Sequence, residues 1–393
     1  MSVMDTIEGS GFPLGFRVDA GGRDAAGSGA CVVEARKMAS AHQKEAVVHQ
    51  GGRRGAWRLV SDEGVHLRGT DLAPFPLGFF NAGLHADLAG RLVTLAKRRG
   101  IGLAELSIRL KNGYSMTGSF FRGDGQGFAE PADIEIEIES EADSGTISAL
   151  VGDAVDASPA LAAMRAPVAT SFALYVNGRR RPLATMAASG AADAPDPFAT
   201  YAEPPSPGSA EAGAADPVRK TGERESGAVE PAPAGTSTRI IRIVDGSCRL
   251  VEPDGLTETE TWLALPGASH FTLRSDERAD RDEAPSGLAL SWAGLAYCFM
   301  TQLDRYIEHM TFAIDGVRLV QYCPDAADIA AGRPVDTHLF LNGREDAETY
   351  ETLMRIAART CYLHATLAAS LEPRVAVLHN GTAIRQVVGA SPV

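Results

Sequence analysis

The sequence lacks a long apolar run and an excess of basic charge. None of its 393 residues belongs to an uninterrupted stretch of the roughly 18 apolar residues that a spanning helix needs. The opening MSVMDTIEGSGF does not place a basic stretch before an apolar one, as a secretory signal does. The net charge of −13 excludes the strong basic footprint of a protein that binds nucleic acid or an anionic membrane. We therefore expect a soluble, cytoplasmic protein with no nucleic-acid partner and no membrane partner.

Cysteine is scarce, and its spacing fits no metal motif. The chain has five cysteines, which are Cys31, Cys248, Cys298, Cys323 and Cys361. The number is odd and no C-x-x-C is present, which argues against a structural zinc site or a secreted disulfide framework. In a reducing compartment we expect all five to remain thiols.

Motifs for a phosphate or metal ligand are also missing. The glycine-rich segments GGRRG and GDGQG lie in polar loops rather than between a strand and a helix, so neither predicts a nucleotide-binding loop. Histidines and acidic residues do not share a ligand spacing on one helix, apart from scattered pairs such as Asp304 and Glu308. The sequence predicts no cofactor and no metal.

An internal repeat is the most informative feature that the chain does have. The segment 74–92, PFPLGFFNAGLHADLAGRL, aligns without a gap on 285–303, PSGLALSWAGLAYCFMTQL, and this pairs Asp87 with Cys298. Further along, Ser158 pairs with Cys361. At both positions a thiol of the second copy faces a first-copy residue that has no redox chemistry.

The repeat and the composition together divide the chain. A length of 393 residues exceeds what one hydrophobic core usually serves, so the copies predict two domains, 1–182 and 238–393. Between them, 183–237 is rich in Ala, Pro, Gly, Glu and Ser and has few large apolar residues. Such a segment buries too little surface to offset its ordering entropy, so we predict a flexible linker.

Hydrophobic periodicity predicts the same elements in both copies. In the first copy we expect strands near 30–35 and 56–60, a helix over 77–98, strands at LSIRL and IEIEIE, a helix over 147–164 and a strand at SFALYVNG. In the second we expect strands near 240–244, 261–265 and 271–274, a helix over 288–309, strands at VRLVQY and THLFLNG, a helix over 346–371 and a strand at RVAVLHNG. The predicted class is α+β, with two long helices on an antiparallel sheet in each domain.

This order of elements resembles the OsmC/Ohr superfamily, the osmotically inducible and organic-hydroperoxide-resistance proteins. The family has one cysteine in its first long helix after a P-x-P-L-E-L-L-L-A-A-L-x-x-C stretch, and PSGLALSWAGLAYC ends here at Cys298. The second family cysteine lies on the second long helix, commonly as C-P. That position holds Cys361-Tyr362 in one copy and Ser158-Pro159 in the other. Both copies also have the upstream SDE tripeptide, 61–63 and 275–277.

The resemblance implies a tandem OsmC-like protein whose two halves pair within one chain as an intramolecular pseudo-dimer. It implies a thiol peroxidase in which Cys298 attacks an organic hydroperoxide and Cys361 resolves the sulfenic acid as a disulfide. The implied partners are a small-molecule hydroperoxide and a dithiol reductant such as a lipoyl protein. The first half, with Asp87 paired to Arg91, is then a structural partner that lacks the cysteine pair.

A reactive thiolate needs a neighbouring cation, and two arginines are candidates. Arg23 lies in a GGRD segment like the Ohr-type turn, and Arg274 lies in FTLR, like the OsmC-type strand. The family glutamate before the first helix is missing, because copy two has Leu288-Ala289 there; Asp282 and Glu283 lie just upstream. Either arginine remains a candidate.

Two other classes of function remain open. His364, three residues after Cys361 on one helix, is a candidate base or thiolate partner, which would suit a cysteine-dependent hydrolase or lyase on a small metabolite; the alternative is a histidine packed at a rim. A non-catalytic small-molecule-binding protein is the other class. Its pocket would be shaped by four aromatic residues, Phe79, Phe80, Trp292 and Tyr297.

Overall fold

The computed structural model describes most of the chain. The described residues are 5–18, 31–40, 42–53, 55–202, 205–207, 216–223, 240–278 and 281–387. Arg23, one of the two arginines predicted to serve Cys298, lies outside them.

Two large sheets account for the strands of the described residues. The first sheet has eight strands in the order β1 (Gly15–Val18), β4 (Ala56–Ser61), β3 (Lys44–Gln50), β2 (Cys31–Lys37), β14 (Ile314–Cys323), β15 (Val335–Gly343), β8 (Thr170–Val176) and β9 (Arg179–Arg181). The second has nine, in the order β10 (Val218–Glu223), β13 (Ser269–Asp276), β12 (Leu256–Leu263), β11 (Ile240–Glu252), β5 (Glu105–Thr117), β7 (Asp133–Glu139), β16 (Arg374–His379) and β17 (Thr382–Val387), with β6 (Gln126–Ala129) beside β5.

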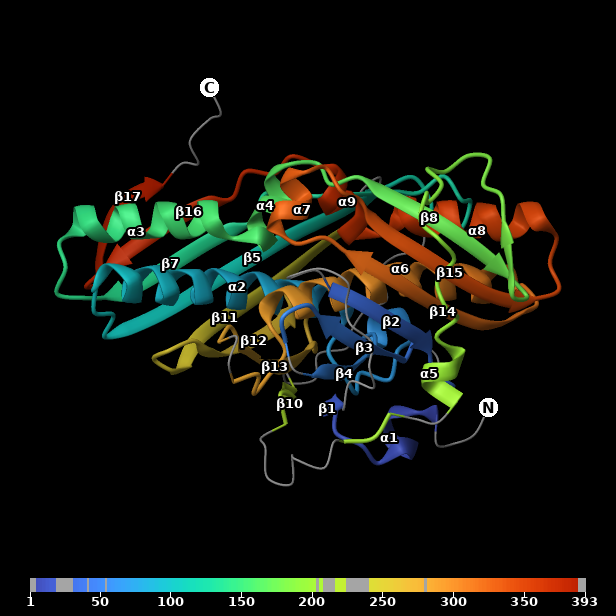
Figure 1. Cartoon of the computed structure of the whole chain (residues 1–393), viewed down its shortest axis with the longest axis horizontal. Helices are drawn as coiled ribbons and strands as arrows, with labels where there is room; N and C mark the ends of the chain where they lie inside the picture. Colours follow the sequence, from blue (N-terminus) through green and yellow to red (C-terminus); the bar gives the residue numbers. More distant parts are fainter. Residues whose placement is uncertain are drawn as a thin grey trace.

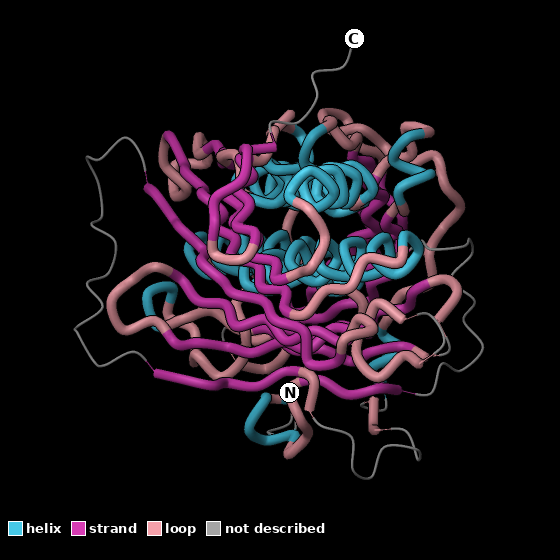
Figure 2. Tube along the Cα trace, turned by 90° about the vertical axis from the view of Figure 1, so that its left-hand side faces the viewer, coloured by secondary structure: helices cyan, strands magenta, loops and turns pink. Residues whose placement is uncertain are grey.

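Helices lie in layers against these sheets. The two long ones are α2 (Pro76–Arg99) and α6 (Gly287–Met310). The shorter ones are α1 (Ile7–Ser10), α3 (Ser144–Ala157), α4 (Pro159–Arg165), α5 (Phe198–Ala202), α7 (Ala326–Ala330), α8 (Ala347–Thr360), α9 (Tyr362–Ala368) and the 3₁₀ turn Val65–Leu67. Figure 1 shows α2 and α6 meeting at the centre, with α3 and α8 towards opposite ends. Figure 2 shows the helices in two rows, with strands beneath them.

The predicted α+β class is confirmed, but the prediction of one antiparallel sheet for each half is wrong. In the first sheet, β14 and β15 of the second half lie between β2 and β8 of the first half, and in the second sheet β5 and β7 lie between β11 and β16. The pairs β15–β8 and β16–β7 are parallel. Neighbouring strands from different halves are not joined by hairpins, so nothing forces them to be antiparallel.

The crossing of α2 and α6 repeats the same contact twice. A Cβ on Gly83 would lie 2.5 Å from the carbonyl oxygen of Gly287, and one on Gly294 would lie 2.8 Å from that of Pro76. In the sequence repeat, Gly83 aligns with Gly294 and Pro76 with Gly287. The repeated glycine therefore lets the two backbones approach closely, and the reciprocal pattern is that of a two-fold contact.

The SDE tripeptides hold the start of each long helix in the same way. The Ser61 hydroxyl donates to the carbonyl oxygen of Pro74 over 2.9 Å, and the Ser275 hydroxyl donates to that of Pro285 over 2.8 Å. The residues that aligned in sequence thus occupy equivalent places in the fold, one beside α2 and the other beside α6.

The second long helix predicted in each half is broken. Residues 147–164 divide at Ser158 into α3 and α4, and 346–371 divide at Cys361 into α8 and α9. Ser158 and Cys361 both have extended backbones, with ψ near 112° and 119°. Pro159 explains the first break, because proline cannot continue α3 but fits the first turn of α4.

The segment predicted to be a flexible linker, 183–237, contains α5 and β10 among its described residues. Tyr201 of α5 is buried, and its hydroxyl donates to the carbonyl oxygen of Glu34 over 2.6 Å. Strand β10 pairs with β13. For these two elements the linker prediction is wrong, because one buried aromatic residue and one strand edge suffice to anchor them.

One continuous hydrophobic core lies between the sheets and the helices, and α2 and α6 are almost wholly inside it. Within the described residues, no single helix has both the length and the apolar character needed to cross a membrane. The pair α3 and α4, bent by 71°, meets that test by length and composition alone.

Candidate functional site

The structure brings Cys298 and Cys361 together. Cys298 lies in the middle of α6, Cys361 lies at the break between α8 and α9, and both side chains are buried. Burial, followed by the hydrogen bond and the charge of Cys298, raises the pKa of Cys361 well above its usual range; the N–H groups of His364 and Leu363 oppose the rise. The sulfurs are free thiols in contact range of each other.

Two cations lie close enough to Cys298 for their charges to interact with it. Lys44 on β3 belongs to the first half, and burial lowers its pKa, while Glu63 and Cys298 act to raise it. Burial also lowers the pKa of Arg305, against the charges of Glu63 and Cys298. Arg305 lies on α6 two helical turns beyond Cys298, and its guanidinium stacks 4.4 Å from the centre of the Phe120 ring.

A hydrogen-bonded chain connects the lysine to a buried carboxylate. Lys44 Nζ donates to Thr301 Oγ1 over 2.9 Å, and the Thr301 hydroxyl donates to Glu63 Oε1 over 2.7 Å. The direct separation between Lys44 Nζ and Glu63 Oε1 is 4.0 Å. Thr301 is one turn after Cys298 on α6, so this chain passes beside the thiol.

A second acid, Asp304, continues the network. Its Oδ2 lies 2.9 Å from His42 Nδ1, and its Oδ1 pairs with Lys37. Although burial opposes ionisation, these partners hold the pKa of Asp304 below its usual value. The acidic and basic side chains around α6 therefore compensate one another, which buried charges require.

Tyr114 of β5 faces both thiols. Burial raises the pKa of its phenol well above the usual range, and the charges of Cys298 and Cys361 raise it further. Its ring centre is 5.5 Å from that of Tyr362. The hydroxyl has no hydrogen-bond partner among the described residues, although it is buried. It is therefore a donor available to a small ligand at the thiols.

Arg274, predicted to serve Cys298, and the upstream acids Asp282 and Glu283 all have other partners. Arg274 Nε is 3.2 Å from Glu258 Oε2 on the neighbouring strand. Asp282 accepts from the Gly55 N–H over 3.2 Å, and Glu283 lies 3.3 Å from Arg278.

His364 lies one turn beyond Cys361 on α9, as predicted. Its ring packs between Phe299 and Phe172, with ring centres at 5.2 and 5.9 Å, and neither ring nitrogen has a hydrogen-bond partner among the described residues. Burial lowers the pKa of His364 to about 4. The imidazole is neutral at pH 7 and packed between aromatic rings, so it is a weak base.

The equivalent place in the first half holds a carboxylate and a hydroxyl. The Ser158 hydroxyl donates to Asp87 Oδ2 over 2.6 Å, and the N–H of Ala160 donates to the same oxygen over 3.2 Å. The predicted partner of Asp87 is confirmed, since Arg91 Nη2 lies 3.3 Å from Asp87 Oδ1. These hydrogen bonds satisfy the buried acid.

Glu277 completes this first-half site, as Glu63 does in the second. It accepts from the Gly287 N–H over 2.6 Å and packs against Gly90, where a Cβ would lie 2.3 Å from Glu277 Cγ. Burial raises the pKa of Glu277, and the nearby charge of Asp87 raises it further. Burial and the charge of Asp87 both favour the protonated form of Glu277.

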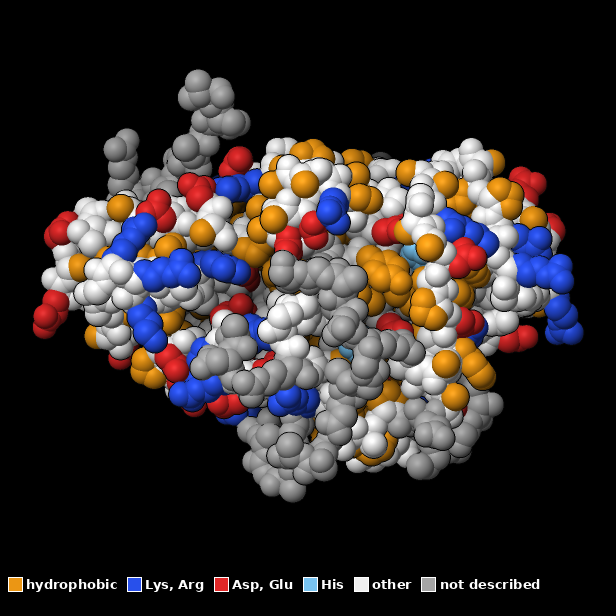
Figure 3. All heavy atoms as spheres, in the orientation of Figure 1, with side chains coloured by type: hydrophobic (Ala, Val, Ile, Leu, Met, Phe, Trp, Pro, Cys, Tyr) orange, Lys and Arg blue, Asp and Glu red, His pale blue; other side chains and the backbone are white. Residues whose placement is uncertain are grey.

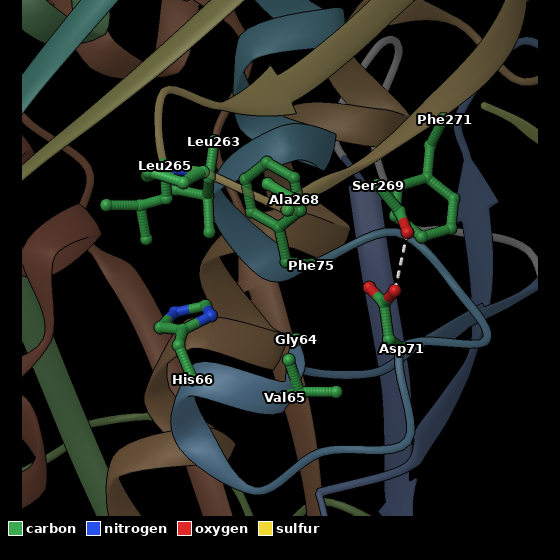
Figure 4. Close-up of a pocket in the computed structure, with 12 residues that line it drawn as sticks. Gly64, Val65, His66, Asp71, Phe75, Leu263, Leu265, Ala268, Ser269 and Phe271 are labelled. Atoms are coloured by element: carbon green, nitrogen blue, oxygen red, sulfur yellow. Dashed lines mark hydrogen bonds between the residues drawn. The ribbon is translucent and has the colours of Figure 1, made fainter. Parts of the chain in front are cut away.

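A pocket opens next to the thiol site. Its lining residues are Gly64, Val65, His66, Asp71, Phe75, Leu263, Leu265, Pro266, Gly267, Ala268, Ser269 and Phe271, and its empty volume is about 360 Å³. Figure 4 shows His66 facing Phe75 across the cavity, and Ser269 bonded to Asp71. Burial lowers the pKa of His66 to about 4, followed by the charges of Arg242 and Arg305, so the pocket adjoins the arginine beside Cys298.

The aromatic residues predicted to shape a pocket are core residues instead. The four residues are Phe79, Phe80, Trp292 and Tyr297. All of them are buried, and none lines the pocket described above. The Tyr297 hydroxyl donates to the carbonyl oxygen of Leu59 over 2.7 Å. The pocket wall comes instead from the turn between β12 and β13 and the segment before α2.

The surface and the acidic side chains suggest no other kind of site. On the face in Figure 3, basic and acidic side chains are interspersed. Within the described residues, no group of three or more His, Cys, Asp or Glu side chains is arranged to hold a metal ion.

Sequence reasoning missed Lys44, Arg305, Glu63 and Tyr114 as neighbours of the thiols. A signal existed for Arg305, because a spacing of seven residues from Cys298 places it on the same helix face. Lys44, Glu63 and Tyr114 belong to the first half, and only the sharing of the sheets brings them to Cys298.

Comparison with protein-family models, with curated proteins and with solved structures found no match to this chain. The argument for a function therefore depends on the geometry of the site and on the motifs of the sequence.

Proposed function

We propose that this chain is a tandem OsmC-like protein, with its halves paired as an intramolecular pseudo-dimer, that reduces organic hydroperoxides through Cys298 and Cys361. The observation that supports this most is the contact of the two thiols, from different helices, beside Lys44 and Arg305. A thiol with cations nearby and a second thiol in reach is what two-cysteine peroxide reduction requires.

The first step forms a sulfenic acid. The Cys298 thiolate attacks the terminal oxygen of the hydroperoxide, the O–O bond breaks, and an alkoxide leaves and is protonated to an alcohol. Lys44 and Arg305 place positive charge beside the attacking sulfur. The unpaired Tyr114 hydroxyl donates a hydrogen bond to the oxygen that leaves.

The second step forms a disulfide. Cys361 attacks the sulfur of the Cys298 sulfenic acid, the S–O bond breaks, and water leaves with the proton of the Cys361 thiol. The proton of the Cys361 thiol goes to the departing hydroxide, because His364, with a pKa of about 4, is too weak a base to take it. An external dithiol then exchanges with the disulfide, which returns both thiols and leaves the reductant oxidised.

Glu63 supplies a carboxylate in place of the family glutamate that this chain lacks. The family glutamate position holds Leu288-Ala289, but Glu63 reaches Thr301 and lies within the charge range of Arg305. Its part is to hold the cations next to Cys298, since a carboxylate partner keeps a buried lysine protonated.

Binding of an apolar small molecule without chemistry is the second candidate. The observation in its favour is the apolar lining of the pocket, which includes Phe75, Leu263 and Phe271. This function needs no thiol, so the cysteine variants separate it from peroxide reduction.

The test is consumption of cumene hydroperoxide with a dithiol reductant. We expect steady turnover by the wild-type protein and none by Cys298→Ser. With the reductant left out, Cys361→Ser should consume about one equivalent and accumulate a sulfenic acid, because no second thiol of the site can form the disulfide. Cys248→Ser is the matched control, since Cys248 is also buried but lies on β11 between the partner strand residues Thr259 and Ile108.

Wild-type turnover in Cys298→Ser would contradict the proposal. Loss of peroxide consumption in the Cys248→Ser control would show that the effect of cysteine substitution is a general loss of the fold.

A further inference from the structure

We propose that Cys31 and Cys323 are a second redox pair, which oxidises to a disulfide that joins β2 of the first half to β14 of the second. This site is separate from the one that holds Cys298 and Cys361, and it does not depend on peroxide turnover there.

Strand register places the two residues opposite each other. Cys31 and Cys323 are direct partners in the antiparallel pair of β2 and β14. Both side chains are buried, whereas the neighbouring pair has Tyr322 more than one third exposed, so the two thiols share the inner face of the sheet. Opposed Cβ atoms in such a pair are about 4.5–5.5 Å apart. A disulfide needs about 3.5–4.5 Å, so a small adjustment suffices.

The position at strand ends makes that adjustment easy. Cys31 is the first residue of β2 and Cys323 is the last residue of β14. Cys323 has no partner on its far side, because the pairing of β14 with β15 ends at Tyr322 and Asp336, whereas Cys31 also pairs with Gln50 of β3. The adjustment is therefore expected at Cys323. Cys323 Sγ makes only weak contacts of 3.6 and 3.9 Å with Gln321, which a disulfide would replace.

The raised pKa values of the two thiols reflect their closeness to each other and predict that they react slowly. Burial raises the pKa of Cys323 well above its usual range, and the charge of Cys31 raises it further. Burial raises the pKa of Cys31 to about 12, opposed by Arg53 and reinforced by Glu277. At pH 7 both are protonated, so oxidation is expected to need sustained exposure rather than a single encounter.

The pair also lies next to the first-half site. The charge of Glu277, which adjoins Asp87, reaches Cys31. The helices around Asp87 have no thiol, because Asp87 and Ser158 occupy those positions, but the sheet beneath supplies two. The molecule thus has two thiol pairs, one between helices of the second half and one across the strands that join the two halves.

The oxidant is a small peroxide such as hydrogen peroxide. One thiol attacks a peroxide oxygen, the O–O bond breaks, and a sulfenic acid and water form. The second thiol attacks the sulfenic sulfur and expels a second water. In total, one peroxide and two thiols give one disulfide and two waters.

The experiment uses Cys298→Ser, Cys361→Ser protein, which leaves Cys31, Cys323 and Cys248. The protein is incubated with hydrogen peroxide, denatured, alkylated and mapped by peptide mass spectrometry. We expect a reducible cross-linked peptide pair that contains Cys31 and Cys323, while Cys248 remains alkylated. A denaturing gel without reductant should show a faster band, because the disulfide closes a loop of most of the chain.

The matched control adds Cys323→Ala to this background, and the cross-link and the faster band should both disappear. Cys31 and Cys323 both alkylated after prolonged peroxide, or converted to sulfinic acids without a cross-link, would overturn the proposal. If the multiple variant does not fold, the peptide map of wild-type protein decides, since its two disulfides give different peptides. Failure of peroxide turnover at Cys298 would leave this result unaffected.

Discussion

The polar neighbours of Cys298 include a lysine, Lys44, and an arginine, Arg305. Asp87, in contrast, has a second carboxyl group, that of Glu277, as its neighbour. Strand register explains part of the difference: Lys44 pairs with Ser61, and the residue that pairs with the equivalent Ser275 is Thr257. Thr301 of the one site aligns with Gly90 of the other. The fold is thus repeated, but the position equivalent to Lys44 holds Thr257, and the arginine of the first-half site, Arg91, is paired with Asp87.

The turns beside the two sites also differ, because one adjoins an open pocket and the other is closed by hydrogen bonds. Next to Cys298, the turn between β12 and β13 leaves the pocket open. At the equivalent turn between β3 and β4, Arg53 donates to the carbonyl oxygen of Arg278 over 2.8 Å and Gly55 to Asp282 over 3.2 Å. The first-half site has no reactive thiol pair, and these hydrogen bonds close the turn beside it.

The largest expected effect comes from removing the cations of the Cys298 site. Each of Lys44→Met and Arg305→Met should slow peroxide reduction about tenfold, and the double variant about a hundredfold, because each charge favours the thiolate. Stopped-flow oxidation of Cys298 across pH measures this, and the rates should recover at high pH. Arg91→Met, which removes the arginine of the Asp87 site, should leave the rate unchanged; an equal loss would contradict the asymmetry.

The two equivalent glutamates should respond with opposite sign. Glu63→Gln should lower the free energy of unfolding by about 3 kcal/mol, because buried Lys44 loses its carboxylate. The pKa of Glu277 is raised on folding, so its stabilising contribution is present below about pH 4.5 and is lost as pH rises through the folded value. Glu277→Gln should therefore raise stability at pH 8 by about 1 kcal/mol. Urea unfolding at pH 5 and pH 8 measures both.

His364 offers a smaller effect on the Cys361 side. Its pKa is about 4 in the fold against 6.5 unfolded, so the unfolded chain binds more protons between these values and stability falls as pH decreases from 6.5 to 4. His364→Leu should reduce that loss and gain about 1 kcal/mol at pH 7, because an unpaired buried imidazole is removed. The same variant should leave the rate of disulfide formation unchanged, because an imidazole with a pKa of about 4 is too weak a base to take the Cys361 proton.

The smallest expected effect is a gain of disulfide formation and slow peroxide turnover at the first-half site. In Asp87→Cys, Ser158→Cys protein the new thiols occupy positions whose present oxygens are 2.6 Å apart, so a disulfide should form on oxidation. Peroxide turnover there should stay at least about tenfold below that of Cys298, because no lysine equivalent to Lys44 lies nearby. A peptide map checks the disulfide, and wild-type turnover at the new pair would show that the charges do not matter.

Local patterns in the sequence predicted much of the fold. Apolar runs and alternation located α2, α6, β5 and β7, and the repeat identified which positions of the two halves correspond. The sharing of the sheets was beyond reach, because pairing between distant strands such as β2 and β14 leaves no local pattern. The same limit hid the break at Cys361, where no proline follows, unlike Ser158-Pro159.

The residues of the candidate site divide in the same way, into those that a local sequence pattern could predict and those that it could not. The two thiols were predictable from the helix motif and the repeat, and Arg305 was predictable from its helical spacing. Arg274 looked suitable in its strand motif, but its side chain pairs with Glu258. Lys44 and Tyr114 reach the thiols from the other half, so no motif near Cys298 could point to them.

The most direct test of the central claim is a peptide map of wild-type protein after brief exposure to cumene hydroperoxide. We predict a disulfide between Cys298 and Cys361 that forms first and is reversed by a dithiol. Cys298 and Cys361 still alkylatable as free thiols after the exposure would contradict the account.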